Sequence, residues 1–208
     1  MHPIFESLTK MKIVPVIVIN DVKNAVPLAH ALCEGGLPCA EVTFRTAAAA
    51  ESIRAITKEF PEMLVGAGTV LTPAQVDEAT AAGAKFMVSP GLNPATVKYC
   101  QEKGIPMLPG VCTPSEIEQG LSLGLEALKF FPAEAAGGVN MLKALSAPYN
   151  KMKFMPTGGL TPSNIKDYLA VKSVFTCGGS WMVKDELINN GDFAKIAELT
   201  REAVELAK

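Results

Sequence analysis

The stretch LVGAGTVLTPAQ, residues 64–75, contains an apolar run, a short turn and the start of a helix. The run LVGAGT is short and apolar, as expected for a strand that is buried on both faces. Thr72 and Pro73 form a helix-start signal, because a threonine side chain caps free N–H groups and proline fits the first helical position. A buried strand that leads into a helix is the repeating unit of a parallel sheet.

The same succession of run, turn and helical pattern occurs along the whole chain. Eight apolar runs can be counted: IVPVIVI, CAEVTF, LVGAGT, FMVSP, MLPGV, ALKFFP, FMPTGG and VFTCGG. Helical patterns separate them at 22–34, 47–60, 73–82, 94–103, 114–123, 139–145 and 164–169. Eight such units in 208 residues predict a (β/α)8 TIM barrel that forms a single domain over residues 1–208.

An open, doubly wound sheet is the main alternative to the barrel. No G-x-G-x-x-G motif follows the first run, which continues into VINDV, and this argues against a dinucleotide-binding sheet. Pro15 lies inside the first run, where it removes a hydrogen-bond donor from the ladder. We therefore expect Pro15 at a bulge or at the start of its strand.

The composition narrows the class of protein. Apolar residues make up 49% of the chain and charged residues 19%, with a net charge of −2, so a large core is expected. The absence of Lys/Arg runs argues against nucleic acid and membrane surfaces as partners. No signal peptide or membrane-spanning run is recognisable, and we expect a cytoplasmic protein.

The cysteines and histidines give little support for a disulfide framework or a metal site. The five cysteines are an odd number without a C-x-x-C pair, which fits a reducing compartment. Cys112 and Cys177 lie in or near predicted strand ends, which raises the question of their sensitivity to oxidation. His2 is expected in a mobile start and His30 in a helical pattern, so a histidine-based metal site is not predicted.

Lys129 lies within EALKFFPAE, residues 126–134, with two apolar neighbours on each side. Barrel enzymes place their chemistry at the carboxyl ends of the strands, whereas Lys85 and Lys153 precede their runs and lie at strand starts. A lysine at this position can extend its ammonium to solvent. Alternatively, burial disfavours the charged form and leaves the neutral amine that forms a Schiff base with a carbonyl substrate. The position favours the second interpretation.

Glu41 and Arg45 accompany the second run, CAEVTFRT. A carboxylate inside a barrel strand needs a partner or a task. The second strand lies opposite the sixth, so Glu41 is expected to face the same cavity as Lys129 and to move protons there. A structural ion pair is the alternative for Glu41. Arg45, at the strand's exit, is suited to bind a substrate carboxylate or to form a salt bridge with a loop.

Glycine pairs occupy the last two turns, PTGGLTPSN (156–164) and CGGSW (177–181). Loops after the seventh and eighth strands of barrels often bind phosphate through backbone N–H groups. Ser180 adds a hydroxyl, and a helix beginning after it is expected to direct its N-terminus at the anion. Thr69 and Pro90 end the third and fourth runs, where they can contact substrate or simply form turns.

Together these motifs resemble 2-keto-3-deoxy-6-phosphogluconate (KDPG) aldolase. The resemblance rests on PVIVI, EVTFRT, VGAGTVLTPAQ, SPGLNP, LKFFPAEAAGG, FMPTGGLTPSN and GGSWMV, and spans nearly the whole chain. It implies a small (β/α)8 class I aldolase of the Entner–Doudoroff pathway that assembles as a homotrimer and needs no cofactor. Such an enzyme cleaves the phosphorylated keto acid to pyruvate and glyceraldehyde 3-phosphate, and commonly also acts on 4-hydroxy-2-oxoglutarate.

The resemblance also implies roles for single residues. Lys129 would form the Schiff base and Glu41 would be the general acid and base. Arg45 and Thr69 would hold the pyruvyl carboxylate. The residues implied to line the cavity are Pro90, Phe131 and Thr157, and those implied at the phosphate are Gly158, Gly159, Gly179 and Ser180.

Two rival functions remain open at this point. A phosphate-binding barrel isomerase or synthase would use Glu41 as its base and Lys129 only for its charge. A sugar-phosphate binding protein would use the glycine turns without catalysis. The sequence does not rank KDPG against its galactonate epimer or 4-hydroxy-2-oxoglutarate, because one stereocentre is decided by contacts that differ by fractions of an ångström.

Overall fold

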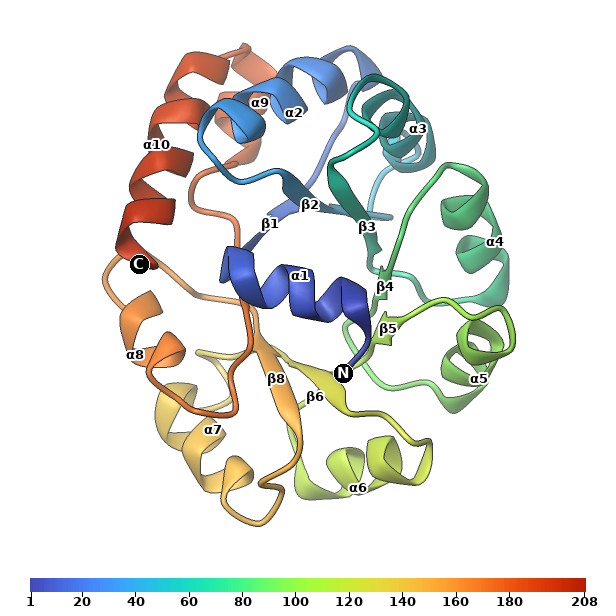
Figure 1. The fold of residues 1–208 in the computed structure, drawn as a ribbon. Coiled ribbons are helices and arrows are strands. Elements are labelled where there is room, and N and C mark those ends of the chain that lie inside the picture. Colours follow the sequence, from blue (N-terminus) through green and yellow to red (C-terminus); the bar gives the residue numbers. More distant parts are fainter.

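Eight parallel strands form a closed barrel in the computed structural model, which describes residues 1–208 (Figure 1). The strand segments are β1 (Ile13–Ile17), β2 (Cys39–Thr43), β3 (Leu64–Gly68), β4 (Met87–Val88), β5 (Met107–Leu108), β6 (Gly110–Val111), β7 (Ala127–Phe130), β8 (Lys153–Pro156) and β9 (Cys177–Gly179). Segments β5 and β6 are two parts of one barrel strand. They are separated by Pro109, which has no N–H to donate.

The hydrogen-bonded register closes the ring. Six segments pair in the order β5-β4-β3-β2-β1-β9, and three pair in the order β6-β7-β8. The chain joins β5 to β6, and parallel bridges Phe154–Val174 and Thr157–Gly178 connect β8 to the β9 region. The predicted (β/α)8 barrel is therefore confirmed, with every predicted run contributing one strand.

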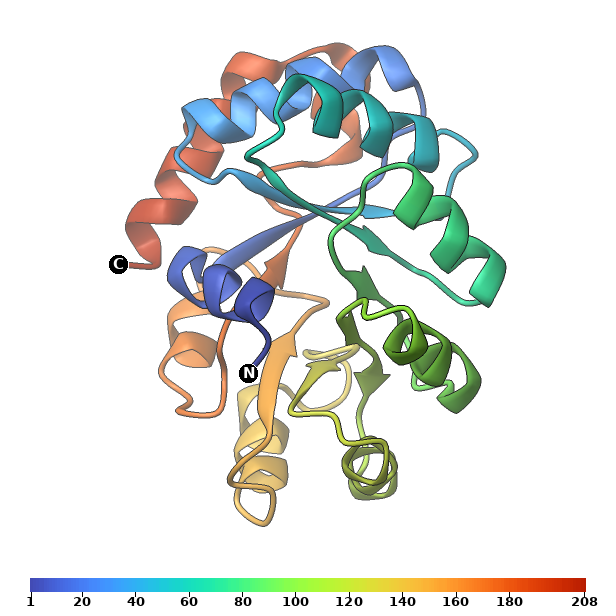
Figure 2. The ribbon, with the colours of Figure 1, turned by 45° about the vertical axis from the view of Figure 1, so that its right-hand side comes forward.

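Helices surround the barrel, as Figures 1 and 2 show. They are α1 (Pro3–Met11), the 3-10 turn η1 (Val22–Asn24), α2 (Ala25–Glu34), α3 (Ala49–Glu59), α4 (Pro73–Ala81), α5 (Pro94–Glu102), α6 (Pro114–Ser122), α7 (Gly138–Ser146), α8 (Ile165–Leu169), α9 (Asp185–Asn190) and α10 (Phe193–Leu206). None of them has the length and apolar character needed to cross a membrane.

The predicted helix starts are confirmed at three Pro-containing sites. The side chains of Thr72, Asn93 and Thr113 each accept a hydrogen bond from an N–H in the first turn of the helix that follows. At Thr113, Glu116 completes a capping box. These caps fix where each helix leaves the strand end, and so they also fix the loops that carry the polar residues.

Pro15 lies in the middle of β1, so its expected placement at a bulge or strand start is wrong. It is paired opposite Gly179, and this is the last register pair between β1 and β9. The missing N–H therefore falls at the end of that ladder, where its loss interrupts no further pairing.

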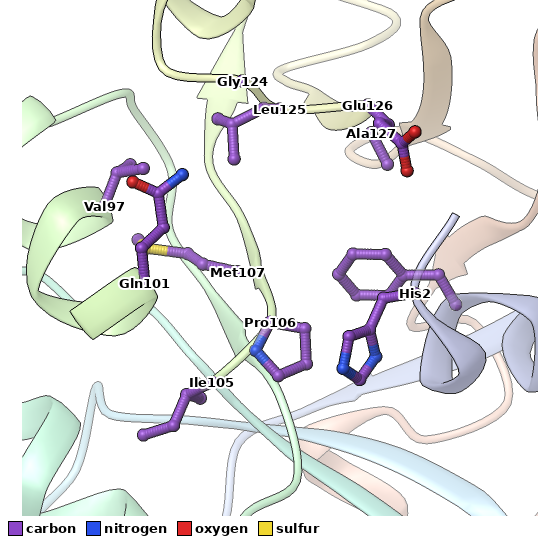
Figure 3. Close-up of a pocket in the computed structure, with 11 residues that line it drawn as sticks. His2, Val97, Gln101, Ile105, Pro106, Met107, Gly124, Leu125, Glu126 and Ala127 are labelled. Carbon is purple, nitrogen blue, oxygen red and sulfur yellow. The ribbon is translucent and has the colours of Figure 1, made fainter. Parts of the chain in front are cut away.

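Helix α1 covers the end of the barrel at which the strands begin (Figure 1). His2 caps α1, because its Nδ1 accepts a hydrogen bond of 3.2 Å from the Ile4 N–H. The terminal ammonium of Met1 lies 3.1 Å from Glu126 Oε2. A cavity with about 570 Å³ of empty space lies beside α1, as Figure 3 shows. This end of a TIM barrel contributes to stability rather than to chemistry.

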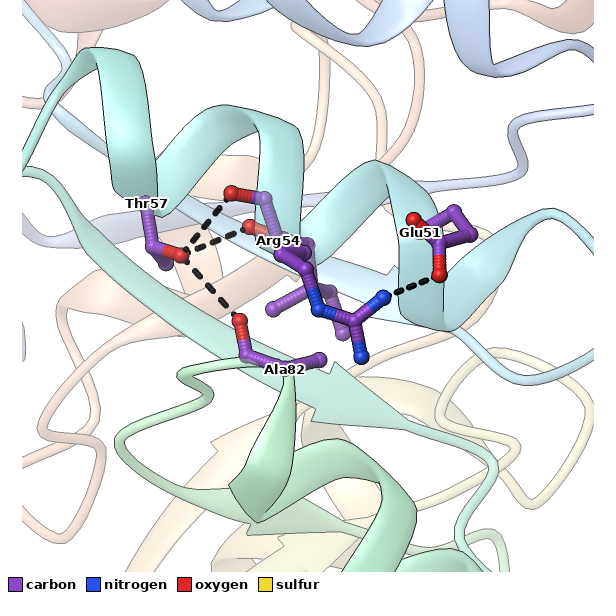
Figure 4. A network of polar contacts seen from close by, with 5 residues as sticks. Glu51, Arg54, Thr57 and Ala82 are labelled. Carbon is purple, nitrogen blue, oxygen red and sulfur yellow. Dashed lines mark hydrogen bonds and ion pairs between the residues drawn. The ribbon is translucent and has the colours of Figure 1, made fainter.

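Contacts between neighbouring helices hold the outer ring together, and Figure 4 shows one of them. The Thr57 hydroxyl of α3 lies 3.0 Å from Ile53 O in its own helix and 3.1 Å from Ala82 O at the end of α4. Nearby, Arg54 pairs with Glu51 on the exposed surface of α3. Arg54 therefore lies at the solvent-exposed surface.

Candidate active site

Lys129 and Glu41 form an ion pair inside the barrel. Lys129 Nζ lies 3.4 Å from Glu41 Oε1, and the two side chains are 6% and 0% exposed. They come from β7 and β2, which lie opposite each other in the ring of strands. A buried ion pair is costly unless its geometry is good or it has a task, and the second Glu41 oxygen has no partner at all. The structure thus brings together the two residues that the sequence predicted to share a cavity.

The surroundings of this pair are apolar and closely packed. The centre of the Phe131 ring lies 5.1 Å from Lys129 Nζ, close enough for a cation–π contact. On the opposite side, Gly68 at the end of β3 leaves space for the carboxylate. A Cβ added there would lie 2.3 Å from Glu41 Oε1. Gly68 is therefore a residue of the site that sequence analysis missed, because nothing in the run GAG distinguishes it from Gly66.

Thr69, directly after Gly68, has a left-handed backbone conformation with φ +57°. For a β-branched residue this conformation is strained, and such strain often occurs at functional sites. Pro90 follows β4, and its carbonyl oxygen takes the space that a side chain on Gly110 would need, since an added Cβ there would lie 2.0 Å from it. Thr69 and Pro90 thus stand at the strand ends, but neither lines the cavity described next.

A second part of the site is an open cavity with about 500 Å³ of empty space. Its walls include seven of the predicted site residues: Arg45, Phe131, Thr157, Gly158, Gly159, Gly179 and Ser180. Phe131 links the two parts, because it lines this cavity and also contacts the Lys129 ammonium group. Val16, Leu160 and Gly178 complete the walls and were not predicted.

Arg45 is exposed at the exit of β2 and is oriented by a neighbouring threonine. Its Nε donates to Thr43 Oγ1 over 3.1 Å, and the Thr43 hydroxyl donates in turn to Ile17 O over 2.8 Å. The remaining guanidinium donors form no contact within the chain and are free to bind an anion. Thr43 was not predicted; its position at the end of the second run, two residues before Arg45, is the signal that could have identified it.

The glycine turn after β8 presents unpaired backbone donors. Gly158 and Gly159 have φ values of +100° and +81°, which side-chain-bearing residues rarely adopt. Their N–H groups donate to no acceptor in the chain, and the same is true of the Ser180 N–H. Free N–H groups lining one cavity are the feature of a backbone anion site.

Thr157 supplies an unpaired hydroxyl to the same region. Its Oγ1 is buried without a hydrogen-bond partner. It packs against Gly178, where an added Cβ would lie 2.3 Å from that oxygen. A buried hydroxyl without a partner is costly, so this group is suited to bind a polar atom of a ligand.

The helix expected directly after Ser180 is not there. Residues 181–184 form a turn, and α9 begins only at Asp185, with Asp185 and Glu186 in its first turn. These two carboxylates offset the positive end of the helix dipole, so α9 is unsuited to bind an anion. The Trp181 ring instead packs against Gly179, where an added Cβ would lie 2.1 Å from it.

The two cysteines at the strand ends are held as neutral thiols. Burial raises the pKa of the Cys177 thiol. Partial burial, followed by the Glu116 carboxylate, raises the pKa of the Cys112 thiol. Because the thiolate is the reactive form, the structure gives neither residue the features of a redox-sensitive cysteine. No group of three His, Cys, Asp or Glu side chains is arranged to hold a metal ion.

Comparison with known proteins places the chain in a family. The family model described as KDPG and KHG aldolase matches residues 4–199. The chain belongs to this aldolase family. It is 51% identical to the KHG/KDPG aldolase of Escherichia coli K12 over 97% of the chain and 94% of that protein. It is 47% identical to the 2-dehydro-3-deoxy-phosphogluconate aldolase of Treponema pallidum over 99% of the chain and 98% of that protein.

Solved structures of KDPG aldolases share the fold. That of Legionella pneumophila, with pyruvate captured at low pH as a covalent carbinolamine, superposes with a TM-score of 0.92 at 43% identity and covers 96% of this chain and 97% of that one. The structure of the Zymomonas mobilis ZM4 enzyme, with 3-phosphoglycerate, superposes with a TM-score of 0.90 at 42% identity. It covers 97% of this chain and 95% of that one. The aldolase family and the (β/α)8 barrel are thus established from both sequence and structure.

Proposed function

We propose that the protein is a class I aldolase that cleaves KDPG to pyruvate and glyceraldehyde 3-phosphate, and that it also acts on 4-hydroxy-2-oxoglutarate. The observation that carries the proposal is the buried Lys129–Glu41 pair, with 3.4 Å between Nζ and Oε1, inside the barrel. The family relationship supports it, as does the carbinolamine in the Legionella pneumophila enzyme.

The reaction starts when Glu41 accepts a proton from Lys129, which leaves a neutral amine as the nucleophile. The amine adds to the C2 carbonyl to give a carbinolamine. Glu41 then gives its proton to the departing hydroxyl, so that water leaves, a protonated imine forms and Glu41 is again a carboxylate. The imine accepts the electron pair of the C3–C4 bond while Glu41 removes the C4 hydroxyl proton, and glyceraldehyde 3-phosphate leaves. Glu41 then returns the proton to C3 of the enamine, and water hydrolyses the imine to pyruvate.

The substrate lies between the lysine and the glycine turns in this proposal. Arg45 and Thr69 bind the pyruvyl carboxylate. Phe131 and Thr157 border the substrate in the open cavity, and Pro90 borders it at the end of β4. The phosphate lies against Gly158, Gly159, Gly179 and Ser180. The free N–H groups of the glycine turn support the phosphate assignment, and the free donors of Arg45 support a role in anion binding.

The assembly and location follow from the resemblance to the family. We propose a homotrimer in the cytoplasm that serves the Entner–Doudoroff pathway. Size-exclusion chromatography with light scattering tests the trimer, because it gives the mass of the particle directly. A monomer at micromolar concentration would overturn that part of the proposal.

Trapping the imine tests the chemistry. Incubation with pyruvate and borohydride should add one pyruvyl unit at Lys129, identified by peptide mass spectrometry, and Lys129→Ala should abolish labelling and cleavage. Lys85→Ala serves as the control, because Lys85 lies on the surface before a strand and should be dispensable. Labelling at Lys85 or Lys153 would overturn the assignment. Turnover without any trapped imine would favour a barrel enzyme that uses Lys129 only for its charge.

A further inference from the structure

The turn Thr157–Gly159 has all three of its carbonyl groups bound by residues that do not line the cavity. Thr157 O accepts from the Ala133 N–H at 2.8 Å, and Gly158 O accepts from the Glu134 N–H at 3.1 Å. Gly159 O accepts from Asn164 Nδ2 at 3.1 Å. Three successive peptide groups are therefore fixed by the segment after β7 and by one side chain.

The N–H groups that follow these carbonyls are left without partners. The N–H groups of Gly158, Gly159 and Leu160 donate to no acceptor in the chain, and all three residues line the cavity. In a trans peptide group the carbonyl and the N–H point in opposite directions. Because residues outside the cavity wall bind the carbonyls, the N–H groups are directed toward the cavity. The donors that hold the carbonyls thus determine the set of N–H groups presented to a ligand.

Asn164 uses both ends of its amide for this purpose. Its Nδ2 donates to Gly159 O, while its Oδ1 accepts from the Thr161 N–H at 2.8 Å. One end meets a carbonyl and the other an N–H, so the orientation of the amide is fixed. Asn164 directly precedes α8 but makes no side-chain cap to it, so its contacts serve the loop rather than the helix.

Glu134 also packs against this turn. A Cβ added at Gly159 would lie 2.6 Å from Glu134 Cβ and Cγ. The hydroxyl of Tyr168, a fully buried residue of α8, donates to Glu134 Oε1. Burial, and then this hydrogen bond, raises the pKa of Tyr168, so the hydroxyl keeps its proton. Glu134 does not line the cavity, although its backbone contacts the glycine turn, which does line it.

We propose that Asn164 and the Glu134–Tyr168 pair are positioning residues for the anion site. Asn164 keeps the Gly159 carbonyl turned outward, and Tyr168 holds the Glu134 carboxylate away from the cavity. Without the Asn164 contact, the Gly159 carbonyl dipole is free to turn toward the phosphate. Without the Tyr168 contact, the negative charge of the Glu134 carboxylate is free to do the same. This inference rests on the proposed phosphate site at the glycine turn. A role of Glu134 at the N-terminus of α7 is the structural alternative.

Substitution of Asn164 tests the first contact. Asn164→Ala should raise KM for KDPG about tenfold, because two hydrogen bonds that order the turn are lost. The kcat for KDPG, and both constants for 4-hydroxy-2-oxoglutarate, should stay unchanged. Asn164→Asp keeps the contact to Thr161 but cannot donate to Gly159 O, and it should raise KM for KDPG further, about a hundredfold. Asn150→Ala, an exposed asparagine without a side-chain hydrogen bond, is the matched control.

A double-mutant cycle tests the second contact. Tyr168→Phe should weaken binding of inorganic phosphate, measured by calorimetry, but should have no further effect in the Glu134→Gln background, where no charge remains to be held. Equal weakening in both backgrounds would assign Tyr168 a purely structural role and overturn this part. The proposed role of Asn164 would be overturned if its variants lost affinity equally for KDPG and 4-hydroxy-2-oxoglutarate. It would also be overturned if they lost none.

Direct phosphate binding keeps this inference separate from the proposed reaction. If wild-type protein trapped no imine, the aldolase proposal would fall, yet phosphate binding by the wild type and the Asn164 variants would still measure the positioning effect. If the imine formed normally but Asn164→Ala bound phosphate as well as the wild type does, the reaction would stand and the positioning inference would be rejected.

Discussion

At one end of the proposed site, two buried side chains face each other: Lys129 Nζ lies 3.4 Å from Glu41 Oε1. At the other end, four of the ten residues that line the cavity are glycines, and the N–H groups of Gly158, Gly159 and Ser180 are free. We refer to them as the lysine end and the glycine end. The first makes and breaks bonds in the proposal, and the second only binds.

This difference in construction determines how each end responds to substitution. At the lysine end, one side chain supplies each function, so its removal deletes the function outright. At the glycine end, no substitution removes an N–H group except one to proline, and several donors share the anion. We therefore expect large, substrate-independent losses at the lysine end and smaller, phosphate-dependent losses at the glycine end.

The largest effect is expected for Glu41→Gln. The amide keeps the shape of the side chain but cannot exchange protons, so kcat should fall by about 10²–10⁴-fold for KDPG and 4-hydroxy-2-oxoglutarate alike. Steady-state kinetics with both substrates measures the loss. Borohydride should still trap pyruvate at Lys129, because imine formation needs the amine and only slows without its neighbouring base.

Glu62→Gln is the control for this variant, since Glu62 is exposed and forms no ion pair or side-chain hydrogen bond. An unchanged rate in Glu41→Gln would reduce Glu41 to a structural ion pair. A loss of activity toward KDPG alone would also contradict the proposal. Losses that depend on the phosphate are expected at the glycine end and not at the lysine end.

Gly68→Ala should produce an intermediate effect at the lysine end. The new methyl group would lie 2.3 Å from Glu41 Oε1 and within 3 Å of the Glu41 Cγ and Cδ atoms, and the buried carboxylate has little room to move. Overpacking of this kind costs about 1–3 kcal/mol. Displacement of a catalytic group by about 1 Å can cost about 10²-fold in rate.

Thermal unfolding and kinetics together test this prediction, with Gly91→Ala as the control because an added methyl group there meets open space. We expect a lower Tm in Gly68→Ala and a loss of kcat for both substrates. A lower Tm with full activity would mean that Glu41 can move without consequence, and the close pairing with Lys129 would lose its proposed importance.

The sequence revealed the lysine end more completely than the glycine end. Lys129 and Glu41 could be predicted because each is a charged residue within an apolar strand, and the barrel rule locates such residues at one cavity. Gly68 escaped prediction because the space it provides depends on a side chain from the neighbouring strand. Sequence spacing does not describe such a contact.

At the glycine end, the sequence indicated the turns but not their supports. Asn164 resembles an ordinary helix-start residue, and its bond to Gly159 O exists only in the folded loop. The helix expected after Ser180 begins only at Asp185, and the Trp181 ring packs back on Gly179, a contact that local spacing does not reveal. Local patterns thus located the donors, while the contacts that orient them arise from the tertiary structure.

The smallest effect is expected for Ser180→Ala at the glycine end. Ser180 supplies one hydroxyl beside several N–H donors, so its loss should cost about 1.5–3 kcal/mol, or about ten- to a hundredfold in kcat/KM for KDPG. Activity toward 4-hydroxy-2-oxoglutarate, which carries no phosphate, should stay unchanged. Ser122→Ala, on the exposed surface of α6, is the control.

Ser180→Asp sharpens the same test, because a carboxylate at this position would repel the phosphate. Arg45 is the one cation among the residues that line the cavity, so little compensation is available. The loss toward KDPG should therefore exceed that of Ser180→Ala, and activity toward 4-hydroxy-2-oxoglutarate should again stay unchanged. If Ser180→Ala slowed both substrates equally, Ser180 would act on the barrel as a whole. The distinction between a reacting end and a phosphate-binding end would then lose its support at this residue.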